Sequence, residues 1–159
     1  MKNIYILFLL GVVVTTLSCE DGNKNYTEEF DSVYYYLKEG VNEFDFYSVN
    51  SAKVQTITVG RGGHGLNGVS TINLVPFTQA EMDEYNATID GDYKLLAPEY
   101  YDMPATVAFE DGVEYRNVDV VFKGNMSELA KTGEYMLPIR LEADNGTVNE
   151  NKNIIYGKP

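Results

Sequence analysis

Beyond the N-terminal thirty residues, hydrophobic and polar positions follow the short alternating pattern of β-strands. In the clearest segment, 53–59, Ile57 and Val59 share one face and Thr56 and Thr58 share the other. A period of two is typical of a strand with one face on a core and the other partly exposed to water. The same criteria, with flanking Gly, Asn and Asp, predict strands at 33–37, 44–47, 53–59, 69–75, 105–109, 117–123, 135–141 and 154–156.

One segment between the strands carries a helical start signal. Thr78 can cap a first turn while Glu81, three residues later, bonds back to it, so we predict one short helix ending near Asn86. Asp111-Gly112 separates two strand-like runs and predicts a hairpin, because glycine tolerates the positive φ of tight turns. Short strands, one small helix and no strand–helix alternation predict an all-β fold, an antiparallel β-sandwich.

The N-terminus has the layout of an export signal. Lys2 precedes an apolar run over 4–17 that is too short to span a bilayer comfortably. The run stops just before Cys19, the only cysteine, where a bacterial lipoprotein signal would be cut and the new terminal cysteine acylated. We predict a lipoprotein signal peptide over 1–18 and lipidation at Cys19; the alternative is a secretory signal with an incidental cysteine. Thr16 departs from the usual signal, which has leucine at that position.

The rest of the chain divides into a tether and one domain. Residues 20–25 are polar and lack apolar periodicity, so we predict a flexible acidic tether over 19–31, and residues 32–159 form the predicted β-sandwich domain. A chain of 159 residues suffices for one ordinary domain.

Composition excludes several kinds of chemistry. Against 12 Lys and Arg stand 24 Asp and Glu, and the formal net charge of −12 repels a phosphate backbone, so we expect no nucleic-acid partner. One cysteine excludes an intramolecular disulfide and a cysteine-based zinc site, and one histidine excludes a two-histidine metal site. We therefore expect no metal, no cofactor and no catalytic residues.

Two motifs imitate ligand sites. Residues 60–65 match the glycine fingerprint of dinucleotide-binding proteins, but that fingerprint must open a helix, whereas 67–75 resemble a turn and a strand. We interpret 60–65 as a flexible loop with His64 exposed. Residues 86–91 partly imitate a calcium loop, but Ala97 stands where the acidic ligand is expected. Acidic residues at 110–114 are interpreted as solvated turn residues.

Aromatic residues are the more useful surface clue. Sugar faces pack on flat rings while their hydroxyls bond to polar side chains. Tyr100 and Tyr101 follow Pro98 in a predicted loop and are our candidate ligand-binding residues. The run of tyrosines at 34–36 is better explained by a strand with alternate rings buried.

Three segments together resemble a known family, namely Glu84-Tyr85-Asn86, then 93–101 and then 135–141. In order and spacing they resemble a Bacteroidota N-terminal domain of unknown function that occurs in surface lipoproteins, including some family 18 endo-β-N-acetylglucosaminidases. The resemblance covers about 33–156, with Ala97 as a small departure. It implies an immunoglobulin-like β-sandwich in a glycan-utilisation setting, and it transfers no catalytic residues.

These observations favour a non-catalytic cell-surface lipoprotein domain that is associated with glycan utilisation and binds glycan. The acidic stretch after Cys19 also resembles the surface-export signal of Bacteroidota lipoproteins, so we expect the outer membrane, a lipid anchor and an outward-facing domain. The alternative is a structural spacer or a protein-interaction module that docks to a neighbouring outer-membrane lipoprotein or importer. A hydrolase that uses two carboxylates is the third hypothesis.

Overall fold

The computed structural model describes residues 32–43, 52–63, 66 and 68–159. The predicted signal peptide, Cys19, the tether, the 44–47 strand and His64 lie outside these residues. The described strands are β1 (Val33–Tyr36), β2 (Gly40–Glu43), β3 (Lys53–Gly62), β4 (Ser70–Pro76), β5 (Lys94–Leu95), β6 (Tyr101–Asp102), β7 (Thr106–Phe109), β8 (Tyr115–Phe122), β9 (Tyr135–Ala143), β10 (Thr147–Val148) and β11 (Ile154–Lys158). The helices are α2 (Gln79–Ile89), the 3-10 turn η2 (Pro98–Tyr100) and α3 (Met126–Ala130).

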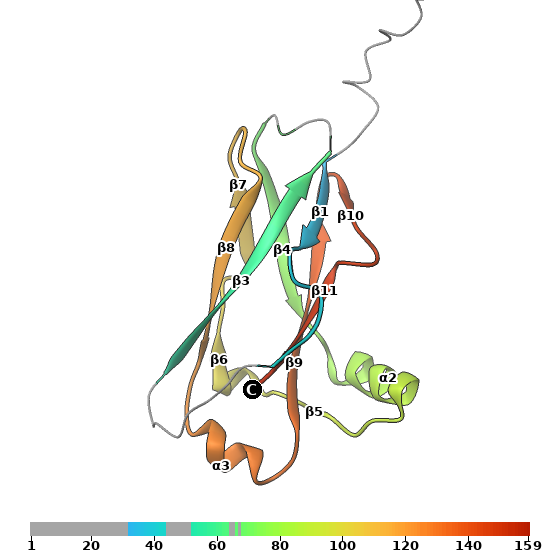
Figure 1. Cartoon of the computed structure of the whole chain (residues 1–159), viewed down its shortest axis with the longest axis vertical. Coiled ribbons are helices and arrows are strands. Elements are labelled where there is room, and N and C mark those ends of the chain that lie inside the picture. The colour runs from blue at the N-terminus through green and yellow to red at the C-terminus, as the bar shows by residue number, and fades with distance from the viewer. Residues whose placement is uncertain (1–31, 44–51, 64–65, 67) are drawn as a thin grey trace, which may run out of the picture. The chain divides into compact units, whose positions relative to one another are not determined.

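The strands form two layers (Figure 1). Sheet A has the order β10-β1-β3-β8-β6, sheet B has the order β2-β11-β9-β4-β7, and β5 adds to β9. The all-β sandwich is confirmed, and each predicted strand that falls in the described residues is present. The four strands that the sequence pattern did not predict, β2, β5, β6 and β10, have four residues or fewer.

The antiparallel prediction is wrong at three pairs. β1 pairs with β10, β2 with β11 and β5 with β9 in parallel. The physical reason is that the chain changes sheets between consecutive strands. After β1, residues 37–39 carry the chain from sheet A to sheet B, where β2 runs alongside the C-terminal strand β11.

The hairpin predicted at Asp111-Gly112 is also wrong. Gly112 does have a positive φ, of 73°, as the turn requires. However, β7 belongs to sheet B and β8 to sheet A, so this turn crosses between the layers. Alternating hydrophobicity identifies both strands but does not reveal which sheet each one joins.

The predicted capping box of α2 is confirmed. The Thr78 hydroxyl accepts a bond from the Glu81 N–H at 3.4 Å, and Glu81 Oε2 accepts one from the Thr78 N–H at 2.7 Å. The helix continues three residues beyond the predicted end, to Ile89. A second helix, α3, was not predicted, although Asn125 caps it by accepting a bond from the Glu128 N–H.

Glu81 also fastens α2 to sheet B through Arg140 of β9, which binds both Glu81 and Glu142. The bond from Arg140, with those from Thr78, lowers the pKa of Glu81 to about 2. A group whose pKa falls on folding stabilises the fold above its unfolded value, near 4.5, and this contribution is lost as the pH falls toward 2.

We therefore expect Glu81→Gln to lower the free energy of unfolding at pH 7, by less than about 1 kcal/mol because the pair is partly solvated. Urea unfolding of both proteins at pH 7 and pH 2.5 checks this. The difference between them should shrink at the lower pH. A difference of equal size at both values would show that the Glu81 charge is not the cause.

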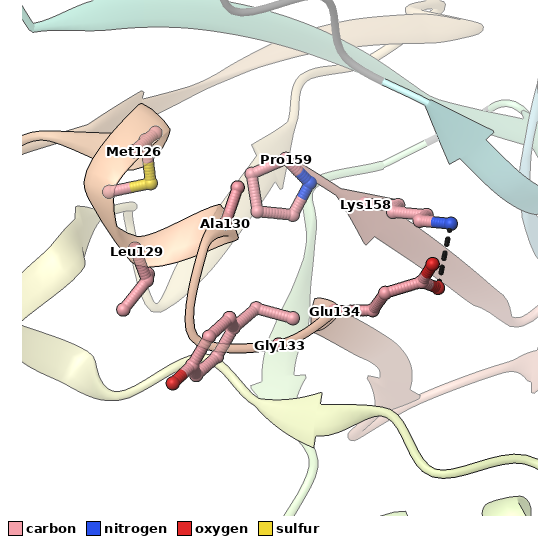
Figure 2. Close-up of a pocket in the computed structure, with 8 residues that line it drawn as sticks. Met126, Leu129, Ala130, Gly133, Glu134, Lys158 and Pro159 are labelled. Atoms are coloured by element: carbon pink, nitrogen blue, oxygen red, sulfur yellow. Dashed lines mark hydrogen bonds and ion pairs between the residues drawn. The ribbon is translucent and has the colours of Figure 1, made fainter.

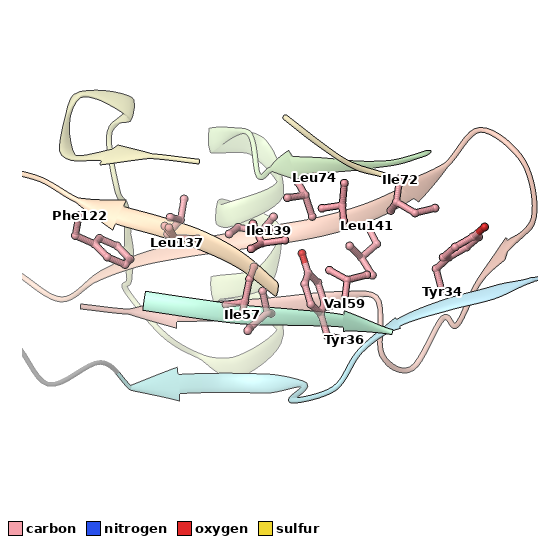
Figure 3. Close-up of a cluster of buried hydrophobic side chains, with 14 of the residues drawn as sticks. Tyr34, Tyr36, Ile57, Val59, Ile72, Leu74, Phe122, Leu137, Ile139 and Leu141 are labelled. Carbon is pink, nitrogen blue, oxygen red and sulfur yellow. The ribbon is translucent and has the colours of Figure 1, made fainter. Parts of the chain in front are cut away.

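The core lies between the two sheets, as Figure 3 shows. In β1, Tyr34 and Tyr36 point into this core while Tyr35 points out, which confirms the predicted alternation. The Tyr36 hydroxyl is buried and has no hydrogen-bond partner among the described residues, and burial raises its pKa. An unpaired buried hydroxyl costs about 1–3 kcal/mol.

Tyr36→Phe removes that hydroxyl and keeps the ring. We expect the free energy of unfolding to rise by about 1 kcal/mol, because the desolvation cost disappears and the packing stays. Denaturant unfolding at pH 7 measures the change. A loss of stability would show instead that the hydroxyl has a bonding partner.

Candidate functional site

The structure places the predicted ligand residues Tyr100 and Tyr101 at the edge of sheet A that β6 forms. Tyr100 closes η2, and Tyr101 starts β6, where it lies opposite Phe122 of β8. The Tyr100 carbonyl accepts a bond from the Lys123 N–H at 2.8 Å. Both side chains are half-buried and pack against the core, and burial raises the pKa of Tyr101. Their binding role stays a prediction.

Two of the acidic residues at 110–114 make structural contacts. Glu110 forms a 3.3 Å ion pair with Arg116, and Asp111 Oδ1 accepts a 2.6 Å bond from the Gly68 N–H. At the calcium-like segment, Asn86 lies in α2, and Asp90 ends that helix with a left-handed φ of 53°. Within residues 32–43, 52–63, 66 and 68–159, no group of three His, Cys, Asp or Glu is placed to hold a metal ion.

The prediction that residues 60–65 form a loop is wrong for Gly60–Gly62, which belong to β3. Arg61 is 2% exposed, and its guanidinium donates to the carbonyl oxygens of four residues. These acceptors are Leu66, Gly68, Glu110 and Val113. The guanidinium also lies 5.5 Å from the centre of the Phe109 ring. Arg61 thus ties the turn between β7 and β8 to β3.

A small pocket of about 240 Å³ lies between α3 and the C-terminal residues (Figure 2). Lys158 reaches Glu134 across its rim, with Nζ and Oε2 3.0 Å apart, and this bond raises the Lys158 pKa. Met126, Leu129 and Tyr135 give the opposite wall its apolar character. The ion pair already satisfies the pocket's charged groups, so we assign it no ligand.

The outward side of sheet A presents a different set of side chains. Register pairs Gly60 of β3 with Tyr35 of β1 on one side and with Tyr115 of β8 on the other. Two residues back along β3, Thr58 lies opposite Asn117. We call the following outward-pointing set the tyrosine face: Tyr35, Thr56, Thr58, Tyr115, Asn117 and Asp119. Neither α2 nor α3 lies over β3 and β8 (Figure 1).

Two glycines of β3 determine where the Tyr35 ring of this face lies. A Cβ on Gly60 would come within 2.6 Å of the Tyr35 Cζ, and one on Gly62 within 3.5 Å of its Cε1. The Tyr35 ring therefore lies across the β3 backbone at both glycines. Burial raises the Tyr35 pKa, as does a side-chain hydrogen bond with Tyr115, which is 49% exposed. Register places both phenols beside Gly60 on the sheet surface.

Below the rings, the polar side chains are paired across the strands. The Thr58 hydroxyl donates to Asn117 Oδ1 at 2.9 Å, and the Thr56 hydroxyl donates to Asp119 Oδ1 at 2.7 Å. A groove of about 570 Å³ opens at the β3 edge. Its apolar lining includes Leu37 and Val41, and its polar lining includes Thr56, Thr58 and Asn117. These contacts hold hydroxyl, amide and carboxylate groups in fixed positions beside the tyrosine rings.

No motif in the sequence marks Tyr115, Asn117 or Asp119 as surface residues of interest. The signal that could have identified them is the pair Gly60 and Gly62 in β3, since a strand glycine often marks a close approach by another group. Without the register, nothing in the sequence places Tyr35 over those glycines.

The three family-like segments meet in space. Asn86 binds the backbone of Tyr93 twice, accepting from its N–H at 3.0 Å and donating to its carbonyl at 2.8 Å. Residues 94–95 then pair with 135–136 as β5 and β9. Tyr85 stacks on Tyr156 with ring centres 4.5 Å apart. These segments therefore fasten α2 to sheet B.

No helix in the described part of the chain is long and apolar enough to cross a membrane.

A family model described as that of an N-terminal domain matches residues 20–148. No curated protein matches the chain.

Several solved structures share the fold. A candidate carbohydrate binding protein from Bacteroides ovatus aligns with a TM-score of 0.66 at 18% identity, over 79% of this chain and 36% of that protein. A two-domain protein of unknown function from Bacteroides fragilis gives 0.61 at 12%, over 82% and 46%. EndoBT-3987 of Bacteroides thetaiotaomicron, solved with a Man5GlcNAc product, gives 0.51 at 15%, over 76% and 28%. The chain thus spans less than half the length of each.

Proposed function

The chain belongs to a Bacteroidota family of N-terminal β-sandwich domains, and from this premise we propose that it is a non-catalytic, glycan-capturing domain of the cell surface. In this proposal, acyl chains on Cys19 hold it in the outer membrane, and the tether extends the sandwich outward. The tether and Cys19 lie outside the described residues, so this part rests on the sequence alone.

The observation that carries glycan capture is the tyrosine face. Binding sites for sugars combine flat rings with a few fixed polar groups. Tyr35 and Tyr115 supply rings, and Asn117 and Asp119 supply amide and carboxylate groups beside them. The fold likeness to a candidate carbohydrate binding protein and to an enzyme solved with a glycan product supports the same function.

A broad panel of polysaccharides and host glycans tests the proposal, with each hit confirmed by calorimetry on the purified protein. We expect specific, saturable binding to at least one glycan. If a folded sample binds no glycan of the panel, glycan capture is contradicted and the alternative below is favoured.

The alternative is a protein-docking module, favoured by the free side of β3. On the side away from β8, residues 54–57 pair with no described strand. Leu37 and Val41, which are 54% and 51% exposed, lie beside this edge. An extended partner segment could add to such an edge by backbone hydrogen bonding. A pull-down from detergent-solubilised membranes that recovers no outer-membrane partner would count against this function.

A further inference from the structure

The geometry points to the tyrosine face as a binding site for a neutral oligosaccharide that lies lengthwise along β3 and β8. This inference deepens the proposed glycan capture and rests on it. It assigns the contact to a different place from Tyr100 and Tyr101, whose rings pack against the core.

The rings are prearranged for stacking. Tyr35 is held against the β3 backbone at Gly60, and register places Tyr115 on the other side of the same glycine. A ring fixed in this way loses little conformational entropy when a sugar packs on it, so more of the contact energy appears as affinity. Tyr115 is about half-exposed, which leaves ring surface available to a ligand.

The polar groups are prearranged as well. Because Asn117 Oδ1 already accepts from Thr58, its amide nitrogen keeps its donors for a ligand hydroxyl. Asp119 accepts from Thr56 through Oδ1, and a carboxylate has further acceptor positions on its second oxygen. The face therefore offers both donors and acceptors, as sugar hydroxyls require.

The dimensions favour an oligosaccharide over a single sugar. Outward side chains recur every second residue along a strand, a spacing of about 6.6–6.8 Å. From the row of Tyr115 to that of Asp119 is two such steps, or about 13 Å. A ligand that contacts both rows must span more than one sugar ring.

Charge selects a neutral ligand. The chain has a formal net charge of −12, and Asp119 lies on the face itself. Two flanking cations are paired, since Arg116 binds Glu110 and Lys123 binds Asp102, and the groove holds Lys38 together with Glu43, so these two add no net charge. A sulfated or uronic oligosaccharide would meet carboxylate without a free compensating cation from Arg116 or Lys123.

Calorimetry with neutral gluco-, manno- and xylo-oligosaccharides, and with sulfated and uronic counterparts, tests the site in the purified protein. We expect a neutral ligand to bind and Tyr115→Ala to weaken it at least tenfold. Gly60→Ala should act similarly, because the added Cβ displaces the Tyr35 ring while the strand backbone stays compatible with alanine. Tyr35→Phe keeps the ring and should change affinity less than threefold.

Tyr93→Ala is the matched control, since this tyrosine lies away from the tyrosine face, with Lys158 Nζ 5.3 Å from its ring centre. Its affinity should equal that of the wild type, and melting curves should show every variant folded. If a variant at Tyr115 or Gly60 does not fold, Asn117→Ala replaces it, with a loss of affinity again expected. If every variant of the tyrosine face binds as tightly as the wild type, the tyrosine face is not the binding site, and glycan capture itself still stands. Stronger binding of the anionic ligands would overturn the neutral class, and no binding to any glycan would overturn both proposals.

Discussion

Replacement of Arg61 by leucine is expected to lower the free energy of unfolding by about 3–5 kcal/mol. The guanidinium is 2% exposed and donates to four backbone carbonyl groups. Leucine would fill part of the volume but leave those carbonyls buried without donors. It would also remove the cation that lies 5.5 Å from the Phe109 ring centre.

Denaturant unfolding compares this variant with Arg116→Leu, which removes an arginine from the same region. Arg116 is partly exposed, and its ion pair with Glu110 lies at the surface, so its loss should cost about 1 kcal/mol or less. Equal effects of the two substitutions would contradict the central structural role given to Arg61.

Cys19→Ser is expected to move the protein from the membrane fraction to the soluble fraction. Each buried methylene group of an acyl chain contributes about 0.8 kcal/mol, so several chains on one cysteine anchor a protein durably. Serine lacks the thiol on which we propose that these chains are carried.

Fractionation of cells that express either form, with labelled fatty acid as a second readout, measures the effect. The wild-type protein should carry label and remain with membranes, and the variant should do neither. A substitution of Ser18 that keeps Cys19 controls for damage to the signal region. A labelled or membrane-bound Cys19→Ser variant would show that the anchor lies elsewhere.

Local patterns predicted local structure well. Alternation at 34–36 correctly predicted that alternate rings are buried, because a strand side chain's face depends on sequence parity, and the structure shows that the buried rings are Tyr34 and Tyr36. The reciprocal bonds of Thr78 and Glu81 lie within one helical turn, so the sequence contains everything needed to predict them.

Long-range features could not be predicted in the same way. The glycine-rich segment around Arg61 resembles a loop by composition, and it is a buried strand end because it pairs with β1 and the β7–β8 turn packs against it. Similarly, the Asp111-Gly112 turn is local, but the assignment of its two strands to different sheets depends on the whole topology.

The candidate site residues show the same contrast between local features, which the sequence predicts, and long-range features, which it does not. Tyr100 and Tyr101 follow a proline in a segment predicted to be a loop, but η2 and β6 pack them against the core. The tyrosine face joins residues from three strands, and its members become neighbours only through the registers of β1, β3 and β8.

The most direct test of glycan capture at the tyrosine face is a two-dimensional ¹⁵N–¹H NMR titration of the protein with a neutral oligosaccharide found by calorimetry. The largest shift changes should fall on the backbone amides of Tyr35, Thr58 and Asn117 and on their strand neighbours. Changes confined to Tyr100 and Tyr101, or spectra that do not change with any glycan, would contradict the account.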